Sequence, residues 1–88
     1  RPTKQMFVGE VIGRDSDTGD LLVDVKNKYA VGDEIELMSP SGNYSFELAE
    51  MRNDLSESID VALGSGRVVQ IPAPENIDSE FSLLMKSL

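Results

Sequence analysis

The 88-residue sequence contains no cysteine, no histidine and no tryptophan. The absence of cysteine excludes disulfides, thiolate metal sites and cysteine nucleophiles. The absence of histidine removes the commonest general base and the commonest metal ligand. No apolar run reaches the ~20 residues that cross a bilayer. We therefore expect no metal, no other cofactor and no membrane contact, and a cytoplasmic location.

Positive charge is also scarce. The sequence has sixteen acidic and eight basic residues, and the resulting net charge of −8 is spread along the chain. Because such a surface repels phosphate backbones, the domain by itself should bind nucleic acid poorly. We interpret the charge mainly as an aid to solubility, with an acidic face that docks on a basic partner as the alternative.

The length suits one domain with a single modest core, since a chain of this size buries only somewhat more than ~60% of its unfolded surface. The sequence begins with Arg1-Pro2 and not with methionine. We interpret it as a piece cut from a longer protein.

Alternating apolar and polar residues predict about six short strands. The clearest is Glu34–Leu37, whose two acids face one way while Ile35 and Leu37 face the other. Turn residues flank it on both sides, at Gly32-Asp33 and at 39–42. The other expected strands are 4–14, 21–26, 43–51, 59–63 and 67–71.

The C-terminal residues follow a different period. Four apolar residues fall at i, i+3, i+4 and i+7, which is one stripe of a helix: Phe81, Leu84, Met85 and Leu88. Asp78 or Ser79 can cap it. We expect residues 76–88 to form a helical lid on an open end or on an outer apolar patch. The predicted fold of residues 1–88 is all-β, a small antiparallel β-barrel of about six short strands with a short C-terminal helix.

Two stretches imitate functional loops. Residues 15–20 resemble the start of a calcium loop, but Gly19 stands at its fifth position and Lys26 at its twelfth, where acids are needed. We predict a hairpin loop there. Gly64-Ser65-Gly66 lacks the Lys-Ser/Thr of a phosphate-binding loop and reads as a tight turn. No catalytic signature is present elsewhere.

Three pieces in a fixed order carry a family resemblance: 8–13 (VGEVIG), 25–36 (VKNKYAVGDEIE) and 66–72 (GRVVQIP). Together they resemble the C-terminal domain of the collagenase-like peptidases, family thirty-two of the peptidases of unknown catalytic type. The resemblance implies a bacterial protein whose upstream barrel domain carries the chemistry. Family members are described as collagenase-like proteases, and some are associated with hydroxylation of transfer or ribosomal RNA. The family's conserved cysteines lie upstream, so no catalytic residue carries over.

The resemblance implies a non-catalytic accessory domain that helps the upstream catalytic domain of the same chain to recognise a protein or RNA substrate. The alternative is a structural domain that stabilises or oligomerises a parent whose activity is RNA hydroxylation and not proteolysis. An independent hydrolase is the weakest hypothesis, because it needs a carboxylate pair working without histidine or cysteine.

Two groups of residues are candidate sites. The first is a small excess of positive charge beside a tyrosine, which can contact RNA: Lys26, Asn27, Lys28 and Tyr29. The second is a group of apolar residues outside the strict alternation, which favours packing on the parent if the helix leaves it uncovered: Val8, Ile12 and Leu22.

Overall fold

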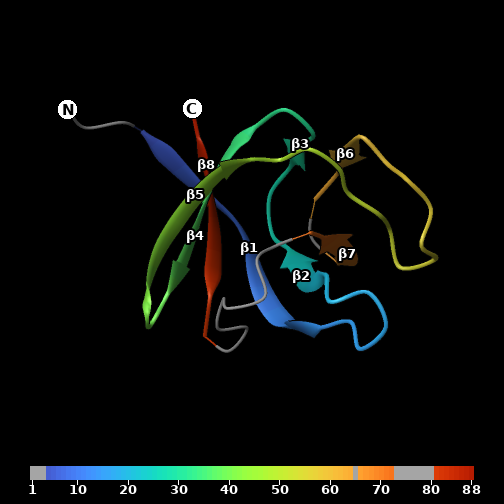
Figure 1. Ribbon diagram of the computed structural model, residues 1–88. Coiled ribbons are helices and arrows are strands. Elements are labelled where there is room, and N and C mark those ends of the chain that lie inside the picture. Colours follow the sequence, from blue (N-terminus) through green and yellow to red (C-terminus); the bar gives the residue numbers. More distant parts are fainter. Residues whose placement is uncertain (1–3, 65, 73–80) are drawn as a thin grey trace.

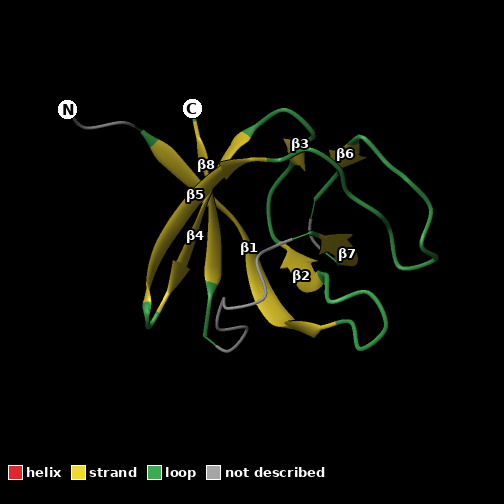
Figure 2. Ribbon diagram, in the orientation of Figure 1, coloured by secondary structure: helices red, strands yellow, loops and turns green. Residues whose placement is uncertain are grey.

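The computed structural model describes residues 4–64, 66–72 and 81–88, and all regular structure in these ranges is β (Figure 1, Figure 2). The strands are β1 (Gln5–Arg14), β2 (Leu21–Val25), β3 (Tyr29–Ala30), β4 (Glu34–Ser39), β5 (Gly42–Glu47), β6 (Val61–Ala62), β7 (Arg67–Ile71) and β8 (Leu83–Ser87). Six of them form one sheet in the order β5-β4-β8-β1-β2-β7, and β3 pairs with β6. Every pairing is antiparallel. The expected all-β antiparallel class is confirmed.

The large sheet does not close on itself. Its end strands are β5 and β7, and within the described ranges no strand pairing joins them, so the expected closed barrel is not found. The outer edge of β7 is occupied instead by a loop residue, since Arg52 and Gln70 exchange two backbone hydrogen bonds of 2.9 and 2.7 Å. The short strands β3 and β6 pair with each other and not with the large sheet.

The C-terminal segment is a strand, which corrects the helical lid expected over residues 76–88. The expected caps Asp78 and Ser79 lie outside the described residues. β8 pairs with β1 on one side and with β4 on the other. Leu84 is fully buried, whereas Leu88, on the same expected helical stripe, is 63% exposed. So short a helix is marginal in water, and two open strand edges satisfy the backbone groups of the segment, so strand pairing prevails over the helical period.

The core follows the alternation of the strands. On β2 the side chains of Leu21, Val23 and Val25 are buried. Directly opposed residues share a face of a sheet, so one inner row crosses four strands from β4 to β2 through the pairs Leu37–Leu84, Leu84–Gly9 and Gly9–Val25. Tyr29 and Ala62 add the β3–β6 sheet to the same cluster.

β1 is irregular at two places. Its register with β8 shifts between Phe7 and Gly9, and its register with β2 shifts between Val11 and Gly13. Each shift leaves one unpaired residue, as in a β-bulge, and a bulge bends its strand and re-aims the neighbouring side chains. Val8 is thereby fully buried, while Ile12 is 54% exposed.

The predicted loops agree better with the structure than the predicted strand ends do. The hairpin loop after β1 is confirmed, with φ +78° at Gly19 and the Asp15 carboxylate accepting the backbone N–H groups of Asp17 and Thr18 at 2.8 and 3.1 Å. The strand predicted over 43–51 ends at Glu47, and the one predicted over 59–63 shrinks to Val61–Ala62.

Candidate functional site

The predicted RNA-contact residues lie between β2 and β3 and at the start of β3. Lys26, Asn27 and Lys28 are exposed, but Tyr29 is fully buried. Its pairing with Ala62 of β6 directs the ring into the core. The ring is therefore not available to stack on a base, and the expectation of an exposed Tyr29 is wrong.

The remaining three residues differ in how free their side chains are. The Lys26 Nζ atom lies 3.1 Å from Asp24 Oδ2, and Asn27 Nδ2 donates to the Phe7 carbonyl oxygen at 2.7 Å. Lys28 is the member of the three whose side chain has no hydrogen-bond or ion-pair partner in the described part of the chain. RNA contact through Lys26, Asn27 and Lys28 stays a prediction.

The hydroxyl of Tyr29 is buried without a hydrogen-bond partner in the described part of the chain. Burial raises the pKa of this phenol, because an apolar surrounding disfavours the charged form. The side chain is therefore a neutral core group.

The predicted interface residues are separated by the fold. Val8 lies in the core with no exposed surface, so its place in an outer interface is wrong, and the bulge in β1 is the physical reason. Ile12 is exposed and Leu22, opposite Gly13, is half-buried. An interface role for Ile12 and Leu22 stays a prediction.

A different group of apolar residues is exposed on the outer face of the large sheet. The register places them side by side, because Met85 is opposite Phe7 while Leu83 is opposite Met38. Phe7 is 37% and Leu83 38% exposed, and the other two are half-buried. We call Phe7, Met38, Leu83 and Met85 the outer strip. The helical interpretation of residues 76–88 missed this strip. The signal in the sequence was the unbroken apolar run Leu83-Leu84-Met85, which is consistent with a strand that has apolar side chains on both faces.

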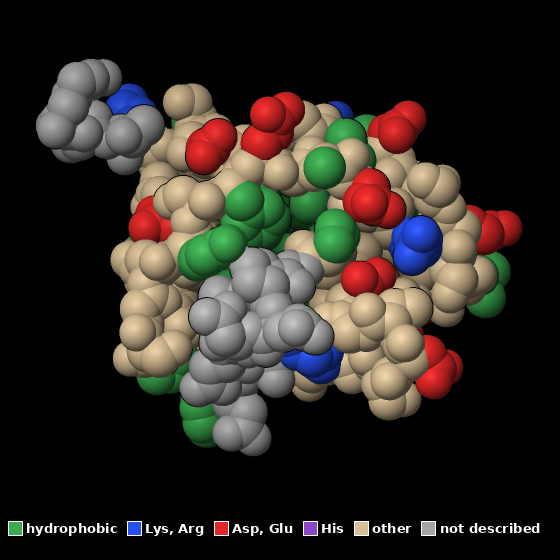
Figure 3. Space-filling view, viewed as in Figure 1, with side chains coloured by type: hydrophobic (Ala, Val, Ile, Leu, Met, Phe, Trp, Pro, Cys, Tyr) green, Lys and Arg blue, Asp and Glu red, His purple; other side chains and the backbone are tan. Residues whose placement is uncertain are grey.

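Acidic residues flank the outer strip. Glu10 is opposite Leu83, and Glu36 is opposite Met85. On the face of the molecule drawn in Figure 3, hydrophobic side chains gather near the middle and acidic side chains lie around them. An apolar strip with acidic borders suits a partner surface that is apolar at its centre and basic at its rim.

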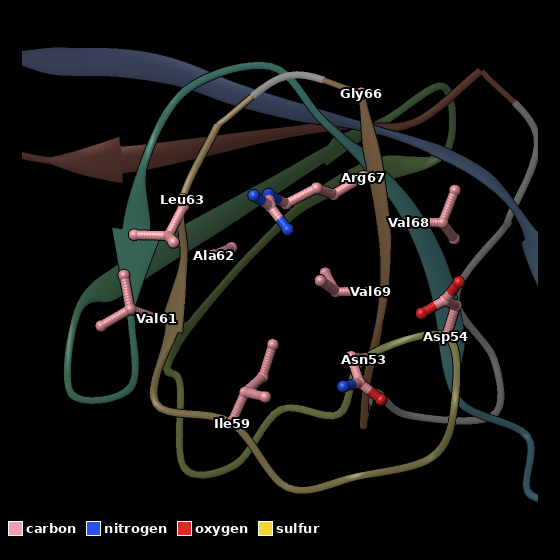
Figure 4. A pocket seen from close by; sticks show the side chains of 10 residues that line it. All are labelled: Asn53, Asp54, Ile59, Val61, Ala62, Leu63, Gly66, Arg67, Val68 and Val69. Carbon is pink, nitrogen blue, oxygen red and sulfur yellow. The ribbon is translucent and has the colours of Figure 1, made fainter.

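A hollow of about 460 Å³ lies beside β7, between this strand and the segment from Ile59 to Leu63 (Figure 4). We call it the β6–β7 groove. Its lining combines apolar and polar surface, with six apolar side chains among its ten lining residues and Arg67 and Asp54 as the charged ones. The guanidinium of Arg67 points into the space between the two segments.

Within the described ranges, no three acidic residues are grouped so that they could share a metal ion. The same part of the chain contains no helix long and apolar enough to span a membrane. The Asp15 carboxylate has a pKa below its ordinary value, chiefly because it accepts the N–H groups of Thr18 and Asp17. These bonds close the hairpin loop.

Comparison with curated proteins gives two relatives of the same name. The chain is 41% identical over 85 residues to tRNA hydroxylation protein P of Haemophilus influenzae, and 44% identical over 85 residues to tRNA hydroxylation protein P of Escherichia coli. The alignments cover 97% and 96% of this chain. They cover only 18% of each relative, so the chain spans about a fifth of the length of these proteins.

Two crystal structures share the fold. Both are C-terminal domains of a candidate U32 peptidase of Geobacillus thermoleovorans, one of them a selenomethionine variant. Their TM-scores are 0.78 and 0.79 at 22% and 23% identity, with 90% and 91% of this chain and 96% and 90% of theirs covered. The model of the peptidase family U32 C-terminal domain matches residues 3–84. The resemblance seen in the sequence is thereby confirmed, and the chain belongs to the family of peptidase family U32 C-terminal domains.

Proposed function

We propose that this chain is a non-catalytic accessory domain of a longer protein that takes part in tRNA hydroxylation. We further propose that it acts by packing its outer strip against the rest of that protein, here called the whole protein. The observation that carries the first part is the identity of more than 40% to two proteins named for tRNA hydroxylation, over nearly all of this chain. These names favour RNA modification over the peptidase activity that the family description implies.

The packing role is supported by the chemistry of the surface. Phe7 and Leu83 expose more than a third of their surface next to two half-buried methionines, and contiguous apolar surface of this kind is typical of interfaces. A second copy of the chain is a poor occupant, because two domains of charge −8 repel each other. The rest of the same protein can occupy the strip without a separate molecule having to approach, because the covalent connection keeps its effective concentration near the strip high.

Deletion of residues 1–88 from the whole protein tests the proposal. The level of hydroxylated tRNA, the affinity for tRNA and the melting temperature would be measured separately. We expect a lower melting temperature and less hydroxylated tRNA, with little change in tRNA affinity. A loss of tRNA affinity at an unchanged melting temperature would contradict the packing role and favour substrate recognition.

Substitutions on the outer strip test the surface itself. The double variant Phe7→Ser/Leu83→Ser should lower the melting temperature of the whole protein more than that of the isolated 88-residue chain. Leu55→Ser/Leu88→Ser is the matched control, because both leucines are exposed, at 73% and 63%, and lie outside the strip. Equal effects of the two double variants on the whole protein would contradict docking through the strip.

The predicted RNA contact can be tested in the same protein. Lys26→Gln/Lys28→Gln removes both charges, and we expect tRNA affinity to change less than threefold, because the surrounding surface is acidic. A larger loss that depends on salt concentration would favour direct RNA contact at this loop.

A further inference from the structure

The β6–β7 groove lies where a neighbouring strand of β7 is missing. β7 pairs with β2 along its whole length on one edge. On its other edge the partner is Arg52, which exchanges backbone hydrogen bonds with Gln70 in an antiparallel bridge. Backbone groups of alternate residues in a strand point to the same edge, so the N–H and C=O of Val68 face the groove as those of Gln70 face Arg52.

The chain leaves this edge directly after Arg52. Asn53 donates its N–H to the Glu57 carbonyl at 2.9 Å, and its side-chain oxygen accepts the N–H groups of Leu55 and Glu57, both at 2.9 Å. These bonds close a tight turn, in which Ser56 has a φ of +63°. Among the described residues, no backbone group pairs with Val68 on the groove side. An open strand edge of this kind accepts an added strand.

The side chains around this edge add chemistry to it. Val69 and Ala62 are buried beneath the groove, and Ile59 is half-buried along it, so the groove can hold apolar side chains. Arg67 has no ion pair in the described part of the chain, and its guanidinium points from β7 toward Ala62 and Leu63. Asp54 lies on the other side of β7, on the side of Val68, and farther from Gly66 along the strand (Figure 4). The groove is therefore positive at one end and negative at the other.

We propose that the β6–β7 groove binds an extended polypeptide segment, which adds to β7 as an antiparallel strand in line with Arg52. The segment hydrogen-bonds Val68, places apolar side chains over Val69 and Ala62, and brings a carboxylate to Arg67. The added segment runs in the same direction as the chain at Arg52. Its N-terminal end therefore lies near Asp54 and its C-terminal end near Arg67. The charges thus select a basic residue before the apolar residues and an acidic residue after them. This site is separate from the outer strip and does not depend on tRNA hydroxylation.

Two capped tetrapeptides of identical composition test the site: acetyl-Lys-Thr-Val-Glu-amide, which pairs its threonine with Val68 and ends before the position of Arg52, and its reversal, acetyl-Glu-Val-Thr-Lys-amide. Each is titrated into the ¹⁵N-labelled 88-residue chain, and backbone amide shifts are followed by NMR. We expect millimolar binding of the first peptide, with the largest shifts at Arg67 and Val68. The reversed peptide should bind about 3- to 10-fold more weakly, the size of one or two exposed charge contacts.

Variants separate the proposal from non-specific binding. Arg67→Gln should reduce the difference between the two peptides to less than twofold, while Lys28→Gln, which removes an exposed charge outside the groove, should preserve it. N-methylation of the threonine should weaken binding at least threefold, because it removes the backbone donor that faces Val68. Equal binding of both peptides, shifts centred outside residues 59–70, or no saturable shift at up to about 10 mM peptide would overturn the proposal.

Discussion

Gly9 of β1 lies so close to Val23 of β2 that a Cβ atom on Gly9 would be 2.6 Å from the Val23 Cγ1 atom and 3.1 Å from the Asp24 carbonyl oxygen. The absence of a side chain at Gly9 therefore lets β1 and β2 approach each other in the inner row of the sheet. The outward Gly13 differs, because its added Cβ would lie 3.9 Å from Leu22 Cδ1, an ordinary contact distance.

Gly9→Ala should lower the free energy of unfolding by about 1–3 kcal/mol, the usual effect of overpacking a core. Gly13→Ala is the matched control and should change it by less than about 0.5 kcal/mol. Urea denaturation of the two variants measures both values. Equal stability of the variants would mean that β1 and β2 do not approach as closely as the structure has them.

Leu84→Ala should lower the free energy of unfolding by about 2–5 kcal/mol, because Leu84 is fully buried between Leu37 and Gly9. Leu88→Ala should change it by less than about 0.5 kcal/mol, because Leu88 is exposed. A helix would bury both leucines on one stripe, so similar losses in the two variants would contradict the strand β8. Thermal or urea unfolding gives the comparison.

Tyr29→Phe should leave the free energy of unfolding unchanged or raise it by up to about 1 kcal/mol. The substitution removes a buried hydroxyl that has no partner among the described residues and keeps the ring that fills the core. Tyr29→Ala, in contrast, should lower it by about 3–5 kcal/mol, as expected for loss of a buried aromatic ring. A clear destabilisation by Tyr29→Phe would reveal a hydrogen bond that the hydroxyl makes in solution.

Asp15→Asn should flatten the acid side of the stability curve. The pKa of Asp15 in the folded chain lies below its ordinary value of 3.8, so its contribution is complete above that value and is lost as the pH falls through the lowered pKa. As the pH is lowered from about 5 to about 2, the urea concentration at the unfolding midpoint should therefore fall less steeply for Asp15→Asn than for the unsubstituted chain. Asp17→Asn is the matched control, because Asp17 is an acid in the same turn that accepts neither of these backbone bonds.

The patterns that were predicted correctly depend on neighbouring residues. The alternation of Leu21, Val23 and Val25 indicates a half-buried strand, and Gly19 after a run of Asp and Ser indicates a turn, whatever the rest of the chain does. The absence of histidine and cysteine, the net charge and the family resemblance are likewise properties of the sequence itself. The alternation predicted the all-β class, and the resemblance predicted the family.

The residues that were misplaced depend on pairing between distant segments. Phe81, Leu84, Met85 and Leu88 fit a helical stripe, but the open edges of β1 and β4 offered hydrogen-bond partners more than 40 residues away, and the segment became a strand. The bulge that buries Val8 and the β3–β6 pairing that buries Tyr29 also arise only when separate strands meet. Both proposed surfaces, the outer strip and the β6–β7 groove, are products of this long-range register. The sequence by itself therefore determined the class, the family and the charge, while only the tertiary structure decided which side chains are available to a partner, because strand register sets the face on which each side chain lies.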